Sequence, residues 1–159
     1  MSGKRITRIF STPLSASPEK IFPLLCPTKE YDWIPTWQCE IIYSKSGLAE
    51  LGCVFSTDFG DASGTEIWVI CTYEKNRQVG FVKTGVHHTT RYNVDLKPNE
   101  TGSIIRWKQE ITSLDDHGDK LVDKITEKVY NEKMWHINTL LENYVLHGEP
   151  INDNAPDHR

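Results

Sequence analysis

Short segments rich in β-branched and aromatic residues recur along most of the chain, and one long segment with helical periodicity follows them. The β-rich segments cover residues 39–44, 52–59, 66–73, 78–84, 89–96 and 103–113. Most of the connections between them are only a few residues long and rich in Gly, Asn, Asp and Ser, as β-hairpin turns are. We therefore expect successive strands to pair antiparallel.

Residues 4–12 alternate polar and apolar side chains, which predicts a further strand, although the pattern leaves its inward face open. Ser17, Pro18 and Glu19 then match the start of a helix, with an N-cap, a proline at the first helical position and an acid in the first turn. Pro23 and Pro27 keep this helical region short.

The last predicted element is one helix of about 25 residues over residues 121–146, where apolar side chains recur at helical spacing. Gly148 and Pro150 end it. A chain of 159 residues is the length of one ordinary domain. We expect that domain over residues 1–148, and a disordered tail over the polar residues 149–159.

The charge and hydropathy of the chain argue against two classes of partner. The net charge is -4, and the lysines and arginines are scattered, which argues against nucleic-acid binding. The longest apolar run, residues 67–71, is far too short to span a membrane, and the N-terminus lacks the apolar core of a secretion signal. The expected location is therefore cytoplasmic.

No common catalytic or metal-binding motif occurs in the sequence. There is no P-loop, dinucleotide fingerprint, nucleophile elbow or H-E-x-x-H. His87 and His88 are neighbours in a strand and point to opposite faces, so they do not chelate one metal together. The cysteines form no C-x-x-C pair and are expected to be reduced and mostly buried; they are Cys26, Cys39, Cys53 and Cys71. We predict no metal and no cofactor.

The segment after the first predicted strand carries a family resemblance. Ser-Pro-Glu-Lys-Ile-Phe-Pro-Leu at residues 17–24, followed by Trp-Ile-Pro-Thr-Trp at residues 33–37, resembles the polyketide cyclase/dehydrase and lipid-transport-like group of the SRPBCC superfamily (START and birch-pollen-allergen proteins). The resemblance extends over residues 4–147. It implies an α+β helix-grip fold, in which a curved seven-stranded antiparallel sheet wraps around a long C-terminal helix, with two short helices after the first strand.

The resemblance also implies a hydrophobic cavity between the sheet and the C-terminal helix. Large aromatic side chains prefer burial with their polar groups paired, and here they also become candidates to line that cavity. Trp68 is ambiguous, because Ile67 and Val69 make the opposite face of its strand equally apolar. Alternation places Arg106, Lys108 and Glu110 on the solvent face of the last strand. The candidates from the strands and loops are Trp33, Trp37, Asp58, Trp68, Tyr92, Trp107 and Gln109.

One face of the last predicted helix adds further candidates. A helical wheel places Thr126, Val129, Lys133, Ile137 and Leu140 along the line expected to meet the sheet. Lys133 either anchors an anionic group of a ligand or covers apolar surface with its methylenes while its ammonium reaches water. His136, at the edge of this face, is either a packed side chain or an acid–base group. Asp58 would be a partner for Lys133 only if the strand face that it shares with Val54 and Ser56 is inward.

Three functions stay open at this level. The first is a non-enzymatic protein that binds or carries a small hydrophobic molecule, lipid-like or aromatic and with or without an anionic group. The second is an enzyme of the polyketide cyclase/dehydratase type, whose one or two acid–base groups would leave no sequence signature. The third is a protein-interaction module like the co-chaperone branch. A homodimer is compatible with each.

Overall fold

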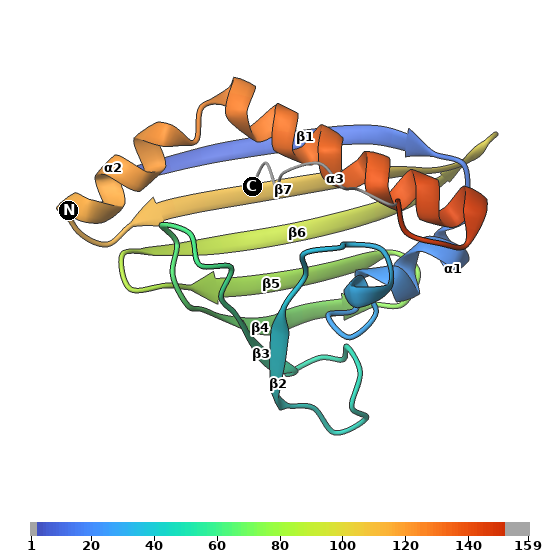
Figure 1. Cartoon of the computed structure of the whole chain (residues 1–159), viewed down its shortest axis with the longest axis horizontal. Coiled ribbons are helices and arrows are strands. Elements are labelled where there is room, and N and C mark those ends of the chain that lie inside the picture. Colours follow the sequence, from blue (N-terminus) through green and yellow to red (C-terminus); the bar gives the residue numbers. More distant parts are fainter. Residues whose placement is uncertain (1–2, 152–159) are drawn as a thin grey trace.

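The computed structural model describes residues 3–151, and it has one sheet with helices on one side of it (Figure 1). In chain order the elements are β1 (Arg5–Leu14), α1 (Pro18–Ile21), the 3₁₀ turns η1 (Phe22–Leu25) and η2 (Glu30–Asp32), β2 (Cys39–Tyr43), β3 (Val54–Thr57), β4 (Glu66–Glu74), β5 (Gln78–Thr84), β6 (His88–Asn99), β7 (Gly102–Ser113), α2 (Asp116–Lys124) and α3 (Glu127–His147). The predicted element order is confirmed.

The sheet has seven strands in the order β1-β7-β6-β5-β4-β3-β2, and every neighbouring pair is antiparallel. Strands β2 to β7 are successive hairpins, as the short connections predict. The first strand instead pairs with the last, so β1 and β2 form opposite edges and the sheet is not closed. The segment between α1 and β2 must therefore cross from one edge to the other, and α3 runs beside β1 (Figure 1).

The alternation of burial confirms the predicted facing of the last two strands. Tyr92 and Trp107 are buried, whereas Arg106 is exposed and points to the outer face. The structure also settles the facing of β4, since Trp68 is 8% exposed while Ile67 is 40% exposed. The inner face of the sheet and one side of α3 together form the main hydrophobic core.

The predicted single C-terminal helix is wrong in one respect, because the chain breaks it at Ile125 and Thr126. Ile125 leaves the helical region with φ −88° and ψ 66°, and its carbonyl accepts a hydrogen bond from Arg8 Nε at 3.0 Å. Thr126 is extended, and its hydroxyl accepts the N–H of Val129 at 3.2 Å, so it is the N-cap of α3. Apolar residues recur at helical spacing on both sides of the break, so the sequence pattern does not reveal it.

The buried face of α3 also differs from the predicted one. Thr126 is an exposed cap, and Val129 is 49% exposed rather than buried. The side chains that face the sheet instead include Tyr130, Met134 and Asn138. The predicted inward line was therefore rotated by about one residue around the helix, although Leu140 is buried as expected.

Three other expectations concern the cysteines, the membrane and the tail. Cys26 and Cys53 are buried, Cys39 is partly buried and Cys71 is exposed, and all are free thiols. No helix within residues 3–151 has the length and apolar character needed to cross a bilayer. Ile151 packs against the core, and residues 152–159, most of the predicted disordered tail, lie outside the described residues.

The cap at Thr126 generates a prediction. Replacing Thr126 with Ala leaves the N–H of Val129 without its side-chain acceptor, so the free energy of unfolding should fall by about 1 kcal/mol. The matched control is Thr139→Ala, because the Thr139 hydroxyl only bonds back to the carbonyl of Trp135 on the exposed side of the same helix. That change should stay within about 0.5 kcal/mol of the parent in urea unfolding. Equal losses for the two variants would contradict a specific role for the cap.

Candidate functional site

A buried ionic cluster lies on the inner face of the sheet. Glu66 Oε2 is 2.8 Å from His88 Nε2 and 3.6 Å from Lys83 Nζ. The side chains are 6% exposed for Glu66, 9% for His88 and 14% for Lys83. Ionisable groups are rarely buried this deeply without a structural or functional reason.

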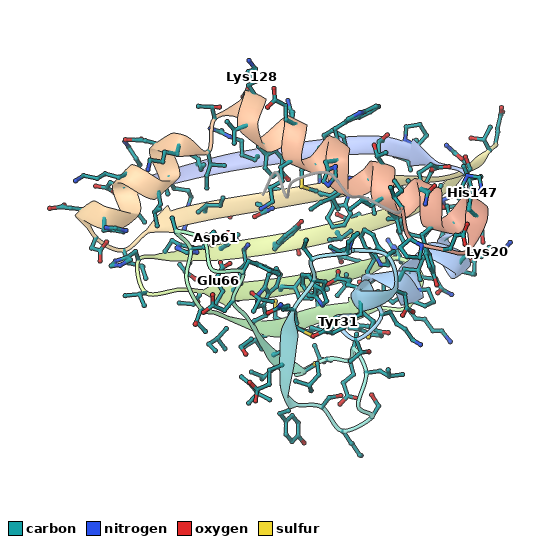
Figure 2. The ribbon with its side chains drawn as sticks, in the orientation of Figure 1. Lys20, Tyr31, Asp61, Glu66, Lys128 and His147 are labelled. Carbon is teal, nitrogen blue, oxygen red and sulfur yellow. The ribbon has the colours of Figure 1, made fainter. Side chains whose placement is uncertain are left out.

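The register of the strands brings these three side chains together. Trp68 of β4 pairs with Lys83 of β5, which in turn pairs with Thr90 of β6. Glu66 lies two residues before Trp68, and His88 lies two residues before Thr90. Both therefore point to the same face of the sheet as Trp68, Lys83 and Thr90. Figure 2 shows Glu66 beside the connection between β3 and β4, far from Lys20 of α1 at the other end of the molecule.

Gly85 leaves room for the imidazole of His88. A Cβ atom at this position would lie 2.8 Å from His88 Cε1, which is closer than real contacts allow. The N–H of Gly85 donates to the carbonyl of His88 at 3.0 Å, so the turn between β5 and β6 holds both residues together. A side chain at position 85 would therefore displace the ring of His88 from its present position beside Glu66.

Two aromatic rings complete the surroundings of Lys83. Its Nζ lies 4.8 Å from the ring centre of Trp68 and 5.7 Å from that of Tyr92, which are cation–π distances. Trp68 Nε1 donates to Thr57 Oγ1 at 2.9 Å, which fixes the indole on the inner face. The ammonium therefore has aromatic faces and one carboxylate around it in place of water.

The charges around Glu66 control its ionisation. Burial alone would raise the pKa of this carboxyl, but Lys83, the hydrogen bond to His88 and the more distant Lys133 outweigh burial and hold the pKa below its usual value. Lys133 itself is exposed on α3. Glu66 is thus an ionised carboxylate at neutral pH.

Buried polar atoms around the cluster lack partners. Among residues 3–151, His88 Nδ1 and Thr90 Oγ1 are buried and make no hydrogen bond. Burial raises the pKa of Tyr130 to about 12, and the interaction of its hydroxyl with the side chain of Gln109 opposes this rise. A buried polar atom without a partner costs about 1–3 kcal/mol, so two of them on neighbouring positions of one strand are unusual for a site that is only structural.

Glu30 of η2 is a partly buried carboxyl group in the segment that crosses from β1 to β2. Burial raises its pKa well above the usual value, with a smaller contribution from Cys26. Its carboxyl in turn contributes to the raised pKa of Tyr92, behind the larger effects of burial and Tyr130. The segment that crosses from β1 to β2 therefore adds a carboxyl group with a raised pKa near Tyr92.

The structure places the predicted site residues in three groups. Tyr92, Trp107, Gln109 and Trp68 lie together on the inner face, and Trp107 Nε1 donates to Asn138 Oδ1 of α3 at 3.1 Å. Trp33 is 1% exposed and Trp37 is partly buried. The indole N–H of Trp33 donates to the carbonyl of Leu24, and that of Trp37 donates to the carbonyl of Pro27, each at 2.8 Å. Both tryptophans therefore stabilise the segment that crosses from β1 to β2.

The remaining predicted residues do not join the inner face. Asp58 is exposed and accepts hydrogen bonds from Gly60 and Thr65, so the strand face that it shares with Val54 and Ser56 is the outer one. His136, like Thr126 and Val129, is exposed. Ile137 of α3 is partly buried against the core. Asp58 is therefore not a partner for Lys133.

Glu66, Lys83, His88 and Thr90 were missed in the sequence. A charged residue at the end of a strand is usually solvated, and no motif links these positions. A usable signal was that Lys83 and His88 flank one short turn and face the same side as the aromatic residues of their strands. Within the described chain no group of three or more His, Cys, Asp or Glu side chains is arranged to hold a metal ion.

The cluster generates a prediction about pH. Replacing Glu66 with Gln leaves the buried Lys83 without its counter-charge, so the free energy of unfolding at pH 7 should fall by about 3 kcal/mol. Because the pKa of Glu66 is lower when folded than when unfolded, its contribution is present above about pH 4.3 and is lost as the pH falls further. The difference between the parent and the variant should therefore shrink in acid.

The matched control for this prediction is Glu110→Gln. Glu110 pairs with the exposed Arg91 at 3.5 Å on the outer face, and its loss should cost less than about 1 kcal/mol. Urea unfolding of the three proteins at pH 7 and pH 4 makes the comparison. If Glu66→Gln costs no more than Glu110→Gln, the buried cluster is not a stabilising ion pair.

Comparisons with known proteins agree with this architecture. Protein MLL2253 from Mesorhizobium loti is 15% identical, with a TM-score of 0.67 over 91% of this chain and 99% of that one. DynU16, from the dynemicin biosynthetic locus, is 12% identical, with a TM-score of 0.65 over 91% of this chain and 48% of that one. Ara h 8.0201 is 16% identical, with a TM-score of 0.61 over 90% and 99%.

At these identities the likeness concerns the fold. No protein-family model matches the sequence, and no curated protein matches it significantly. The similarity nevertheless extends over 90–91% of this chain in all three solved structures. The chain has a helix-grip fold, with a seven-stranded antiparallel sheet and a long C-terminal helix.

Proposed function

We propose that this protein binds a small amphipathic molecule, with an apolar or aromatic body and an anionic group, between the inner face of the sheet and α3. The observation that carries the proposal is the buried Glu66–Lys83–His88 cluster, which lies among aromatic side chains and beside polar atoms without partners. Apolar pockets with a few convergent polar groups and perturbed pKa values are typical binding sites.

The surroundings of Lys83 favour an anionic ligand. The ammonium of Lys83 lies beside the rings of Trp68 and Tyr92, 3.6 Å from the carboxylate of Glu66, and the more distant Lys133 also acts on that carboxylate. In surroundings of low polarity, an anionic group of a ligand would interact strongly with the ammonium of Lys83.

The aromatic side chains suit a planar or extended apolar body. The ring centres of Phe55 and Trp68 are 5.2 Å apart, and those of Trp68 and Tyr92 are 6.0 Å apart. Phe81 packs edge-on against both Trp68 and Tyr92. This cluster offers ring faces directly beside the ammonium of Lys83.

The unpartnered atoms also support a ligand. Solvent barely reaches two polar atoms in this region, namely His88 Nδ1 and Thr90 Oγ1. A ligand that separates α3 slightly from the sheet would bring its own hydrogen-bonding groups to them, which offsets the cost of their burial. Binding is therefore coupled to a small opening of the core.

One observation favours an enzyme as the second candidate. An imidazole that is oriented by a carboxylate through one nitrogen, with its other nitrogen unpaired, is the arrangement of a general base. His88 has this arrangement with Glu66. A cyclase or dehydratase of the kind considered above would use His88 to remove a proton and Lys83 to stabilise the developing negative charge. DynU16, with which this chain shares its fold, comes from a biosynthetic locus.

Native mass spectrometry of the protein from its own host separates the candidates. A co-purifying lipid or aromatic acid supports the binder, and turnover of an added polyketide-like substrate supports the enzyme. An empty protein with a stoichiometric protein partner would contradict both and favour an interaction module.

The role of Lys133 gives a direct test. Lys133→Met should weaken the binding of a fatty acid by about 1–3 kcal/mol, the scale of a charge-assisted hydrogen bond, and leave its methyl ester unaffected. Lys128→Met is the matched control, because Lys128 lies on the same helix and points away from the sheet (Figure 2). Calorimetric titration of the three proteins makes the comparison. Equal affinities of all three for the free acid would rule out Lys133 as an anchor.

A further inference from the structure

A surface pocket lies at the opposite end of the sheet from the ionic cluster. It lies between η1, the connection from β2 to β3, and the turn between β4 and β5, and its volume is about 150 Å³. Phe22, Leu25, Tyr73 and Val79 form its apolar part. The rings of Phe22 and Tyr73 are in edge contact at 5.3 Å, which shapes one wall.

This pocket is separate from the inner-face site. Val79 and Lys83 are four residues apart on β5, or about 13 Å along the strand. Phe81 lies between them and is buried with Ile70 and Phe55 in the core. A ligand in the pocket therefore does not reach Glu66 or Lys83.

Two lysines stand at the rim without counter-charges. Lys29, before η2, and Lys75, in the turn between β4 and β5, both line the pocket. Within the described part of the chain, neither forms an ion pair or a side-chain hydrogen bond.

The acids close to this rim are already engaged. Glu74 pairs with Arg77 at 3.4 Å, and Glu50 accepts hydrogen bonds from the N–H groups of Lys45 and Ser46. In a protein with a net charge of -4, two ammonium groups that form no ion pair among the described residues flank this apolar hollow. The rim is complementary to an anion.

The volume of the pocket limits the size of the apolar group that it can hold. An apolar cavity of about 150 Å³ accommodates a benzene ring. Asn76, at the rim, is held at a φ of 63°, which fixes the turn that carries Lys75 over the opening. A ring in the pocket with a carboxylate on a short spacer would bring that carboxylate to the lysines.

We propose that this pocket is a second binding site, which takes a benzene-sized apolar group that bears a carboxylate or similar anion. The site does not depend on the proposed inner-face function. The contribution of exposed charges is small, so affinity for a ligand of this size falls in the millimolar range. A shift of amide signals in nitrogen-15 NMR suits such affinities and also reports where the ligand binds.

The experiment titrates the full chain with 3-phenylpropionate, and separately with 3-phenylpropanol, which has the same ring without the charge. We expect saturable shifts of the amide signals of Ala49 and Asn76 with the acid, and none at His88 or Thr90. The double variant Lys29→Gln/Lys75→Gln should bind the acid about three- to tenfold more weakly and the alcohol equally well. The matched control is Lys124→Gln/Lys128→Gln, which changes exposed lysines outside the pocket and should bind the acid as the parent does.

Each other outcome overturns the second site. No saturable shift at Ala49 and Asn76 means that the pocket does not bind this class of ligand. Equal affinity of the two double variants for the acid means that the rim lysines do not recognise the anion. Shifts confined to His88 and Thr90 place the ligand on the inner face, which would support the proposed function and exclude the pocket.

Discussion

A β-bulge in β4 decides which side chains the sheet presents to its interior. The register between β4 and β5 shifts between Ile70 and Thr72, so Cys71 is the extra residue. Without this shift, Ile67 and Val69 would share the inner face with Tyr73. With it, Glu66, Trp68 and Ile70 turn inward while Tyr73 stays against the core. The bulge therefore allows one strand to place Glu66 and Trp68 at the ionic cluster and Tyr73 at the wall of the surface pocket.

The energetics of the inner face favour function over stability as the reason for its charges. A buried ion pair is often no more stable than well-packed apolar side chains of similar volume. Here the pair is accompanied by His88 Nδ1 and Thr90 Oγ1, buried polar atoms that have no partner within residues 3–151 and that a purely structural core would avoid. Retaining such groups is understandable if a ligand supplies the missing hydrogen bonds.

The contacts between α3 and the sheet are specific as well as hydrophobic. Asn138 accepts from the indole of Trp107 and donates to the carbonyl of Met134, so one buried amide fixes the rotation of the helix over β7. The break at Ile125 lets α2 and α3 take different directions, and Arg8 holds the free carbonyl at that break. These polar contacts set which residues of α3, Tyr130 among them, face the cluster.

The sequence by itself determined the element order, the antiparallel hairpins, the facing of β6 and β7 and the helix-grip resemblance, because periodicity and turn residues are local properties. It also identified Trp107, Tyr92 and Gln109 as inner-face residues. Tertiary structure alone decided the inward turn of Glu66 and Trp68, the rotation of α3 around Asn138 and the outward position of Asp58. A bulge and a buried polar pair depend on how one element pairs with another, and such contacts leave little trace in a local pattern of apolar and polar residues.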